Sequence, residues 1–73
     1  MAMTLGQLGT GERARISAIR GGLGLRQKLY LRGLLEGKVV RVVSNCGPVT
    51  VEVERNAVAI GRRMAQKIVV ERC

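Results

Sequence analysis

Two stretches of the chain alternate between apolar and polar residues, which predicts strands that bury one face each. From Glu12 onward the polar and apolar positions fall on opposite sides, namely Arg13, Arg15 and Ser17 against Ala14, Ile16 and Ala18. The segment 49–54 alternates in the same way, with its three valines on one side. Both segments are typical of half-buried strands at the surface of a small sheet.

Three further segments predict strands from their composition. The valine-rich segment 38–44 is interrupted only by Lys38 and Arg41, which indicates a central strand with both faces partly covered. Segment 57–60 is short and apolar, and segment 67–71 has three apolar residues between Lys67 and Glu71, which predicts the closing strand. Residues 45–48 (Asn-Cys-Gly-Pro) have turn chemistry, and Arg55-Asn56 is expected to form a two-residue hairpin turn.

Residues 21–37 predict one short amphipathic helix, over Leu25–Arg32, with glycines on either side. Leu25 and Leu29 lie four residues apart on one face, and Leu34 is placed to continue that face. Gly33 fits the position just past the helix end, where a left-handed conformation is common.

These elements predict a mainly β protein with one domain over residues 1–73. The expected architecture is a small SH3-like β-barrel of about five strands, which removes sheet edges that would otherwise aggregate. The amphipathic helix follows the first strand, and a helical turn at 61–66 precedes the last. Residues 1–11 form an N-terminal arm with Leu5 and Leu8 as its apolar anchors.

The charge of the chain changes the expected partners. There are 13 Lys and Arg residues and 5 acidic residues, which give a net charge of +8. Such a balance favours an acidic protein surface or a polyanion as partner, although no run of basic residues marks a tail. A nucleic-acid-binding barrel is therefore an alternative, with Arg13 and Arg15 along a phosphate track. Base stacking uses aromatic side chains, and Tyr30 is the one aromatic residue.

Catalytic and metal chemistry is poorly supplied. The chain has no His and no Asp, and its glutamates fall mainly on predicted strand faces and turns, so we expect no enzymatic activity and no cofactor. Cys46 and Cys73 are far apart and would form at most an incomplete metal or disulfide site. The glycines at 21–24 lack the Gly-Lys-Ser/Thr ending of a phosphate-binding loop and are read as a hinge. No apolar run of signal-peptide or membrane-spanning length is present, which predicts a soluble cytoplasmic protein.

The outer face of the predicted helix is the candidate interaction surface. If the leucines at 25, 29 and 34 face the core, an apolar cluster with a basic rim borders solvent, consisting of Leu31, Leu35 and Tyr30 with Arg26, Lys28 and Arg32. Two alternatives stay open. Leu31 and Leu35 could instead pack on the N-terminal arm through Leu5 or Leu8, or the same patch could support weak self-association.

The order and spacing of several motifs resemble the FeoA family over about residues 5–70. The matching residues are Arg26-Gln27-Lys28-Leu29, Gly33-Leu34, Gly37, the valines of 39–43, Gly47-Pro48-Val49, Ala57-Val58-Ala59-Ile60, Ala65, Ile68 and Val70. The resemblance implies an SH3-like barrel carrying a helix and an accessory role in ferrous-iron transport. The implied partner is the transporter FeoB at the cytoplasmic face of the membrane, with a transition metal involved by family association. The same module is similar to the C-terminal domain of DtxR-type metal-dependent repressors.

Three residues depart from the family pattern. Glu36 stands where the family usually has Pro, Arg32 where it has an apolar residue, and Leu31 where it has a polar or small one. Glu36 in place of Pro predicts a looser connection from Leu34 to Gly37. Leu31 and Arg32 fall on the candidate surface, so we expect a helix register or contact surface peculiar to this protein.

Overall fold

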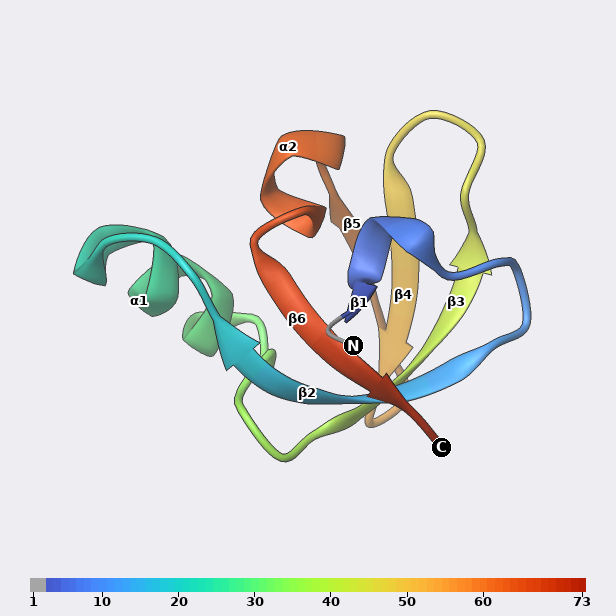
Figure 1. Cartoon of the computed structure of the whole chain (residues 1–73), viewed down its shortest axis with the longest axis horizontal. Coiled ribbons are helices and arrows are strands. Elements are labelled where there is room, and N and C mark those ends of the chain that lie inside the picture. The colour runs from blue at the N-terminus through green and yellow to red at the C-terminus, as the bar shows by residue number, and fades with distance from the viewer. Residues whose placement is uncertain (1–2) are drawn as a thin grey trace.

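The structure, a computed structural model, describes residues 3–73 and shows one curved antiparallel sheet with two α-helices (Figure 1). Within these residues six strands lie in the order β1-β6-β2-β3-β4-β5. The strands are β1 (Met3–Thr4), β2 (Arg13–Ile19), β3 (Val39–Ser44), β4 (Val49–Val53), β5 (Asn56–Ile60) and β6 (Ile68–Arg72). The helices are η1 (Leu5–Gln7), a 3-10 turn, α1 (Leu23–Leu31) and α2 (Arg62–Ala65). The predicted mainly β class and small SH3-like fold are confirmed. The expectation that a closed barrel removes the sheet edges is wrong, because the described sheet ends at β1 on one side and at β5 on the other.

The N-terminal arm contributes the strand that the sequence prediction missed. Met3 pairs with Val70, so β1 extends the sheet beyond β6. Leu5 and Leu8 have no exposed surface, which confirms them as the anchors of the arm. Residues 1 and 2 of the predicted arm lie outside the described residues.

β2 follows the predicted alternation only as far as Ile16. The pairing of β2 with β6 shifts register between Ile16 and Ala18, as a β-bulge does. The bulge places Ala18 at the surface and turns Ile19 into the core, where it is 1% exposed. The prediction that Ala18 points inward is therefore wrong.

β3 has one covered face rather than two. Val40 and Val42 are buried, while Val39 and Val43 are 48% and 45% exposed. The expectation that both faces of this strand are partly covered is wrong, and its valines alternate like the residues of β4.

The hairpin between β4 and β5 turns one residue earlier than predicted. Val53 pairs with Asn56, so the two turn residues are Glu54 and Arg55 instead of Arg55 and Asn56. Both have positive φ, 48° and 73°, as a type I′ turn requires. Neither is a residue that favours this conformation, which is why the sequence pattern placed the turn elsewhere.

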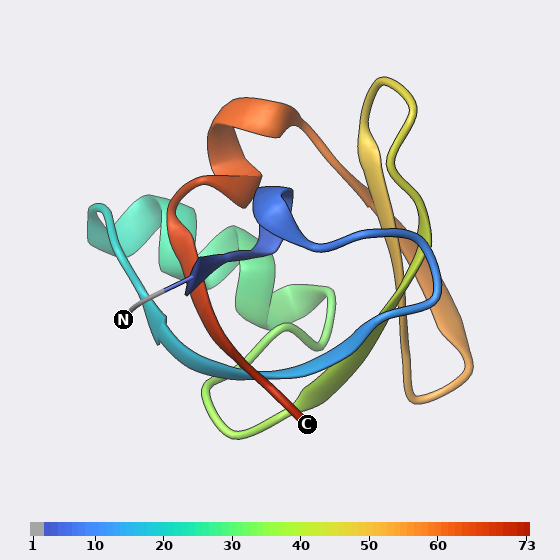
Figure 2. The same cartoon turned by 45° about the vertical axis from the view of Figure 1, so that its right-hand side comes forward.

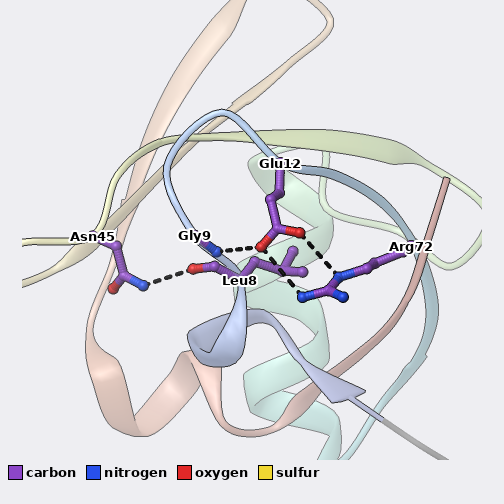
Figure 3. A network of polar contacts seen from close by, with 5 residues as sticks. All are labelled: Leu8, Gly9, Glu12, Asn45 and Arg72. Carbon is purple, nitrogen blue, oxygen red and sulfur yellow. Dashed lines mark hydrogen bonds and ion pairs between the residues drawn. The ribbon is translucent and has the colours of Figure 1, made fainter.

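A polar network fastens the arm to the sheet (Figure 3). Glu12 accepts a hydrogen bond from the backbone N–H of Gly9 at 2.6 Å and forms an ion pair with Arg72 at 3.0 Å. On the other side, the side-chain amide of Asn45 donates to the carbonyl of Leu8 at 2.7 Å. The arm is thus held to β6 and to the β3–β4 loop at the point where Leu8 enters the core.

Candidate protein-docking site at the end of α1

The C-terminal end of α1 is fixed by a Schellman motif. The N–H of Leu34 donates to the carbonyl of Leu29, and the N–H of Gly33 donates to that of Tyr30, each at 3.0 Å. Gly33 has a φ of +86°, which a residue with a Cβ resists. Leu29 and Leu34 are both fully buried, which confirms them as core residues and confirms Gly33 as the residue just past the helix.

Burying Leu29 and Leu34 leaves the next side chains outside. Leu31 is 89% exposed and Tyr30 is 37% exposed at the end of the helix. Leu23, at the start of α1, is 71% exposed and lies seven residues before Tyr30, so the two share a helix face. Leu23 lies outside the helix predicted from the sequence, because the predicted helix begins at Leu25, two residues too late.

The six predicted contact residues do not all share one environment. Leu35 is half-buried in the connection after α1, so it contributes less free surface than Leu31. The alternative in which Leu31 packs on the N-terminal arm is wrong, because its side chain is almost fully exposed. Leu5 and Leu8 instead fill the core.

The basic rim is partly tethered to the backbone. The Nε of Arg26 donates to the carbonyl of Ile19 at the end of β2, over 3.3 Å. The Nη1 of Arg32 reaches the carbonyl of Ala59 on β5, over 3.5 Å. Lys28 is exposed in the last turn of α1, where its charge also favours the negative end of the helix dipole.

Tyr30 is oriented by a neighbouring carboxylate. Its hydroxyl donates to Oε1 of Glu36 at 3.0 Å. This hydrogen bond, together with the negative charge of Glu36, raises the pKa of Tyr30 above its ordinary value, while Arg26 opposes the change. The neutral phenol is the form that donates this hydrogen bond.

An open groove of about 670 Å³ runs between the end of α1 and β5. Its walls are residues 30–33 of the helix end and residues 56–59 of the strand. In Figure 2 α1 runs from the left of the molecule toward its middle, so that its C-terminal end points toward the β5 side. The groove joins segments more than twenty residues apart, so no local sequence pattern indicates it.

Other candidate chemistry is sparse in the described residues. Residues 3–73 contain no group of three or more His, Cys, Asp or Glu side chains placed to hold a metal ion. Cys46 and Cys73 are both exposed and unbridged in this part of the chain. Within the same residues, the structure has no helix long and apolar enough to cross a membrane. The groove and the exposed helix end are thus the best-defined candidate site.

Relatives of known structure share the fold over its whole length. The crystal structure of an iron uptake regulatory protein, FeoA, matches with a TM-score of 0.93 and 32% identity, over 100% of this chain and 99% of that chain. The crystal structure of T. acidophilum IdeR matches with a TM-score of 0.92 and 27% identity, over 99% of this chain but 34% of IdeR. The likeness to a domain of the DtxR/IdeR repressors is confirmed in the fold. These comparisons give no support to the nucleic-acid alternative.

Sequence comparisons agree with the structural ones. A Fe(2+) transport protein A from Methanocaldococcus jannaschii is 37% identical over 62 residues, which cover 84% of this chain and 76% of that protein. The family model described as the FeoA domain matches residues 3–72. The resemblance seen in the motifs is confirmed, and the chain belongs to the FeoA domain family.

Proposed function

We propose that this protein is a non-enzymatic accessory protein of ferrous-iron transport, which docks on an FeoB-type transporter through the end of α1. Its relatives are named for iron(II) transport and iron uptake. The main support for placing the docking surface at the end of α1 is Leu31, which is 89% exposed and lines the groove. Tyr30 and Leu23 are also exposed on the same helix, and exposed apolar side chains that cluster in this way are typical of a contact surface, whereas a single exposed leucine is not.

The charge of the chain supports the same kind of partner. Arg26, Lys28 and Arg32 surround the exposed apolar residues on α1, and the whole chain carries +8. A positive surface of this kind accelerates encounter with an acidic partner more than it adds affinity. Capture by the transporter should therefore weaken as salt increases.

Co-purification tests the role and the face together. Tagged wild-type protein is expected to retain a detergent-solubilised FeoB-type transporter, and Leu31→Ser is expected to retain about tenfold less, as for a residue at the centre of an interface. Val43→Ser is the matched control, because Val43 is 45% exposed on β3 and outside the groove. Circular dichroism first establishes that both variants fold.

The possible outcomes distinguish the accessory role in iron transport from the location of the docking surface. Loss of capture in Leu31→Ser alone supports both parts of the proposal. Equal capture by Leu31→Ser and wild type contradicts the docking face. Absence of capture by the wild-type protein contradicts the accessory role, and salt-dependent binding of RNA or DNA would then replace it.

A further inference from the structure

β5 is the last strand of the sheet, and its outer edge faces the groove. It pairs with β4 alone among the described strands. The turn closes with the pair Val53 and Asn56, and in a two-residue hairpin this closing pair exchanges both hydrogen bonds. The backbone groups of Asn56, Val58 and Ile60 therefore point to β4, and those of Ala57 and Ala59 point outward.

The contact made by Arg32 agrees with this register. Its guanidinium reaches the carbonyl of Ala59, which must point away from β4 for the contact to form. Within residues 3–73, the N–H and carbonyl of Ala57 and the N–H of Ala59 have no hydrogen-bond partner. Exposed edges of this kind accept a further strand, and folded proteins usually cover or charge them.

The side chains around this edge leave room for an added strand. Ala57 and Ala59 are exposed and small, while Val58 between them is buried. The opposite wall of the groove is Tyr30 to Gly33, which offers the apolar side chain of Leu31 and the charge of Arg32. An extended segment lying along β5 would present alternate side chains to that wall.

The positive charge around the groove favours an acidic ligand. Among the residues that line the groove, Arg32 is the one charged side chain and no carboxylate is present. Arg55 precedes β5 and Arg62 and Arg63 follow it. A second copy of this chain would bring another +8 and a second Arg32 to the same edge, which like-charge repulsion disfavours.

We propose that the α1–β5 groove binds an acidic extended segment of the partner, which adds to the sheet as a strand beside β5. The segment would exchange backbone hydrogen bonds with Ala57 and Ala59 and place a carboxylate at Arg32. This inference rests on the proposed function, since it names how the docking partner is recognised. Strand addition derives affinity from the backbone and specificity from alternate side chains.

The test removes an outward N–H without removing an internal hydrogen bond. Ala57→Pro lacks the outward N–H, and proline is tolerated on an edge strand where that group faces solvent. Ala57→Val retains the N–H and adds comparable bulk, so it is the matched control. Binding is measured to the solubilised FeoB-type transporter and, independently, to peptides selected on the wild-type protein from a random twelve-residue display library.

The expected result is that selected peptides are acidic and that Ala57→Pro binds them and the transporter up to about tenfold more weakly than Ala57→Val, as the loss of one hydrogen bond predicts. Amide hydrogen exchange in the wild-type protein gives a second readout that needs no variant. The amides of Ala57 and Ala59 should slow on binding, while that of Val58, already bonded to β4, should change less.

Several results overturn the inference. Peptides that bind Ala57→Pro and Ala57→Val equally, or that leave the exchange of Ala57 and Ala59 unchanged, exclude strand addition. Selection of neutral or basic peptides excludes an acidic ligand. If the wild-type protein dimerises and Ala57→Pro abolishes the dimer, the β5 edge binds a second copy of this chain instead. The wild-type protein could select acidic peptides whose binding depends on Ala57 and still not capture the transporter. This result would overturn the proposed function but would support the binding of acidic segments in the groove.

Discussion

The two edges of the sheet are protected to very different degrees. Within residues 3–73 the edge at β1 is two residues long and passes at once into η1, where Leu5 enters the core. Glu12, Arg72 and Asn45 then fasten the arm that follows (Figure 3). The edge at β5 is five residues long, and in the described chain it is met by one long contact from Arg32. Packing and polar contacts therefore close one edge, whereas the other is left accessible beside the exposed Leu31.

The largest expected effect is a difference in the free energy of unfolding between variants of Leu8, in the arm, and Leu31, beside the β5 edge. Leu8→Ala should lower the free energy of unfolding by about 2–5 kcal/mol, because Leu8 is fully buried and its removal leaves a cavity in a small core. Leu31→Ala should change it by less than about 0.5 kcal/mol, since the side chain is 89% exposed. Urea denaturation of both variants measures the difference, and equal losses would refute the assignment of core and contact residue.

The second largest effect is expected at the polar contacts that Glu12 makes with Gly9 and Arg72. Glu12→Ala removes the acceptor for the N–H of Gly9 and the ion pair with Arg72, and should cost about 1 kcal/mol, because the site is partly exposed. Glu12→Gln keeps an acceptor oxygen and loses the charge, so it should cost less. Thermal unfolding at low and high salt distinguishes the two contributions. A Glu12→Ala variant as stable as wild type would mean that the leucines alone hold the arm.

The hairpin that leads into β5 offers a gain in stability. Arg55 has a φ of 73°, a conformation that costs a residue with a Cβ free energy and that glycine adopts freely. Arg55→Gly should raise the free energy of unfolding by about 0.5–1 kcal/mol, because relief of backbone strain outweighs the added entropy of the unfolded chain. Arg55→Ala is the control, since it removes the charge but keeps the strain. A destabilised Arg55→Gly would contradict the type I′ assignment.

Local patterns were sufficient to predict most of the fold. Alternation placed Val49, Val51 and Val53 inward, and spacing placed Leu29 and Leu34 in the core, as the structure confirms. The errors come from local backbone irregularities, which the periodicity of apolar and polar residues does not reveal. A bulge displaced Ala18, and a turn made of Glu54 and Arg55 uses residues that rarely take positive φ.

The site was predicted less completely than the fold. Tyr30, Leu31 and Arg32 were identified because a helix with one buried face must expose the other. Their role in docking stays a prediction. The groove itself needs β5 beside the helix, and that contact joins residues about 27 positions apart, as the Arg32–Ala59 hydrogen bond shows. No pattern within a single element contains such information.

The smallest expected effect reports on the groove directly. Tyr30 lines the groove and is the one aromatic residue, so its phenolate absorbance can be titrated without interference. The hydrogen bond to Glu36 raises the pKa of Tyr30, so its stabilising contribution is complete below the ordinary tyrosine pKa of about 10 and is lost as pH rises through the raised value. Glu36→Gln removes the charge and should bring the pKa of Tyr30 back toward its ordinary value.

The same titration sharpens the comparison between the two edges. An acidic segment bound beside Arg32 would bring negative charge near Tyr30 and raise its pKa further. Adding the selected acidic peptide should therefore shift the titration of wild-type protein upward and, at the same peptide concentration, shift that of Ala57→Pro less. An identical titration of wild type with and without bound peptide would place the peptide outside the groove, and it would leave the β5 edge unoccupied.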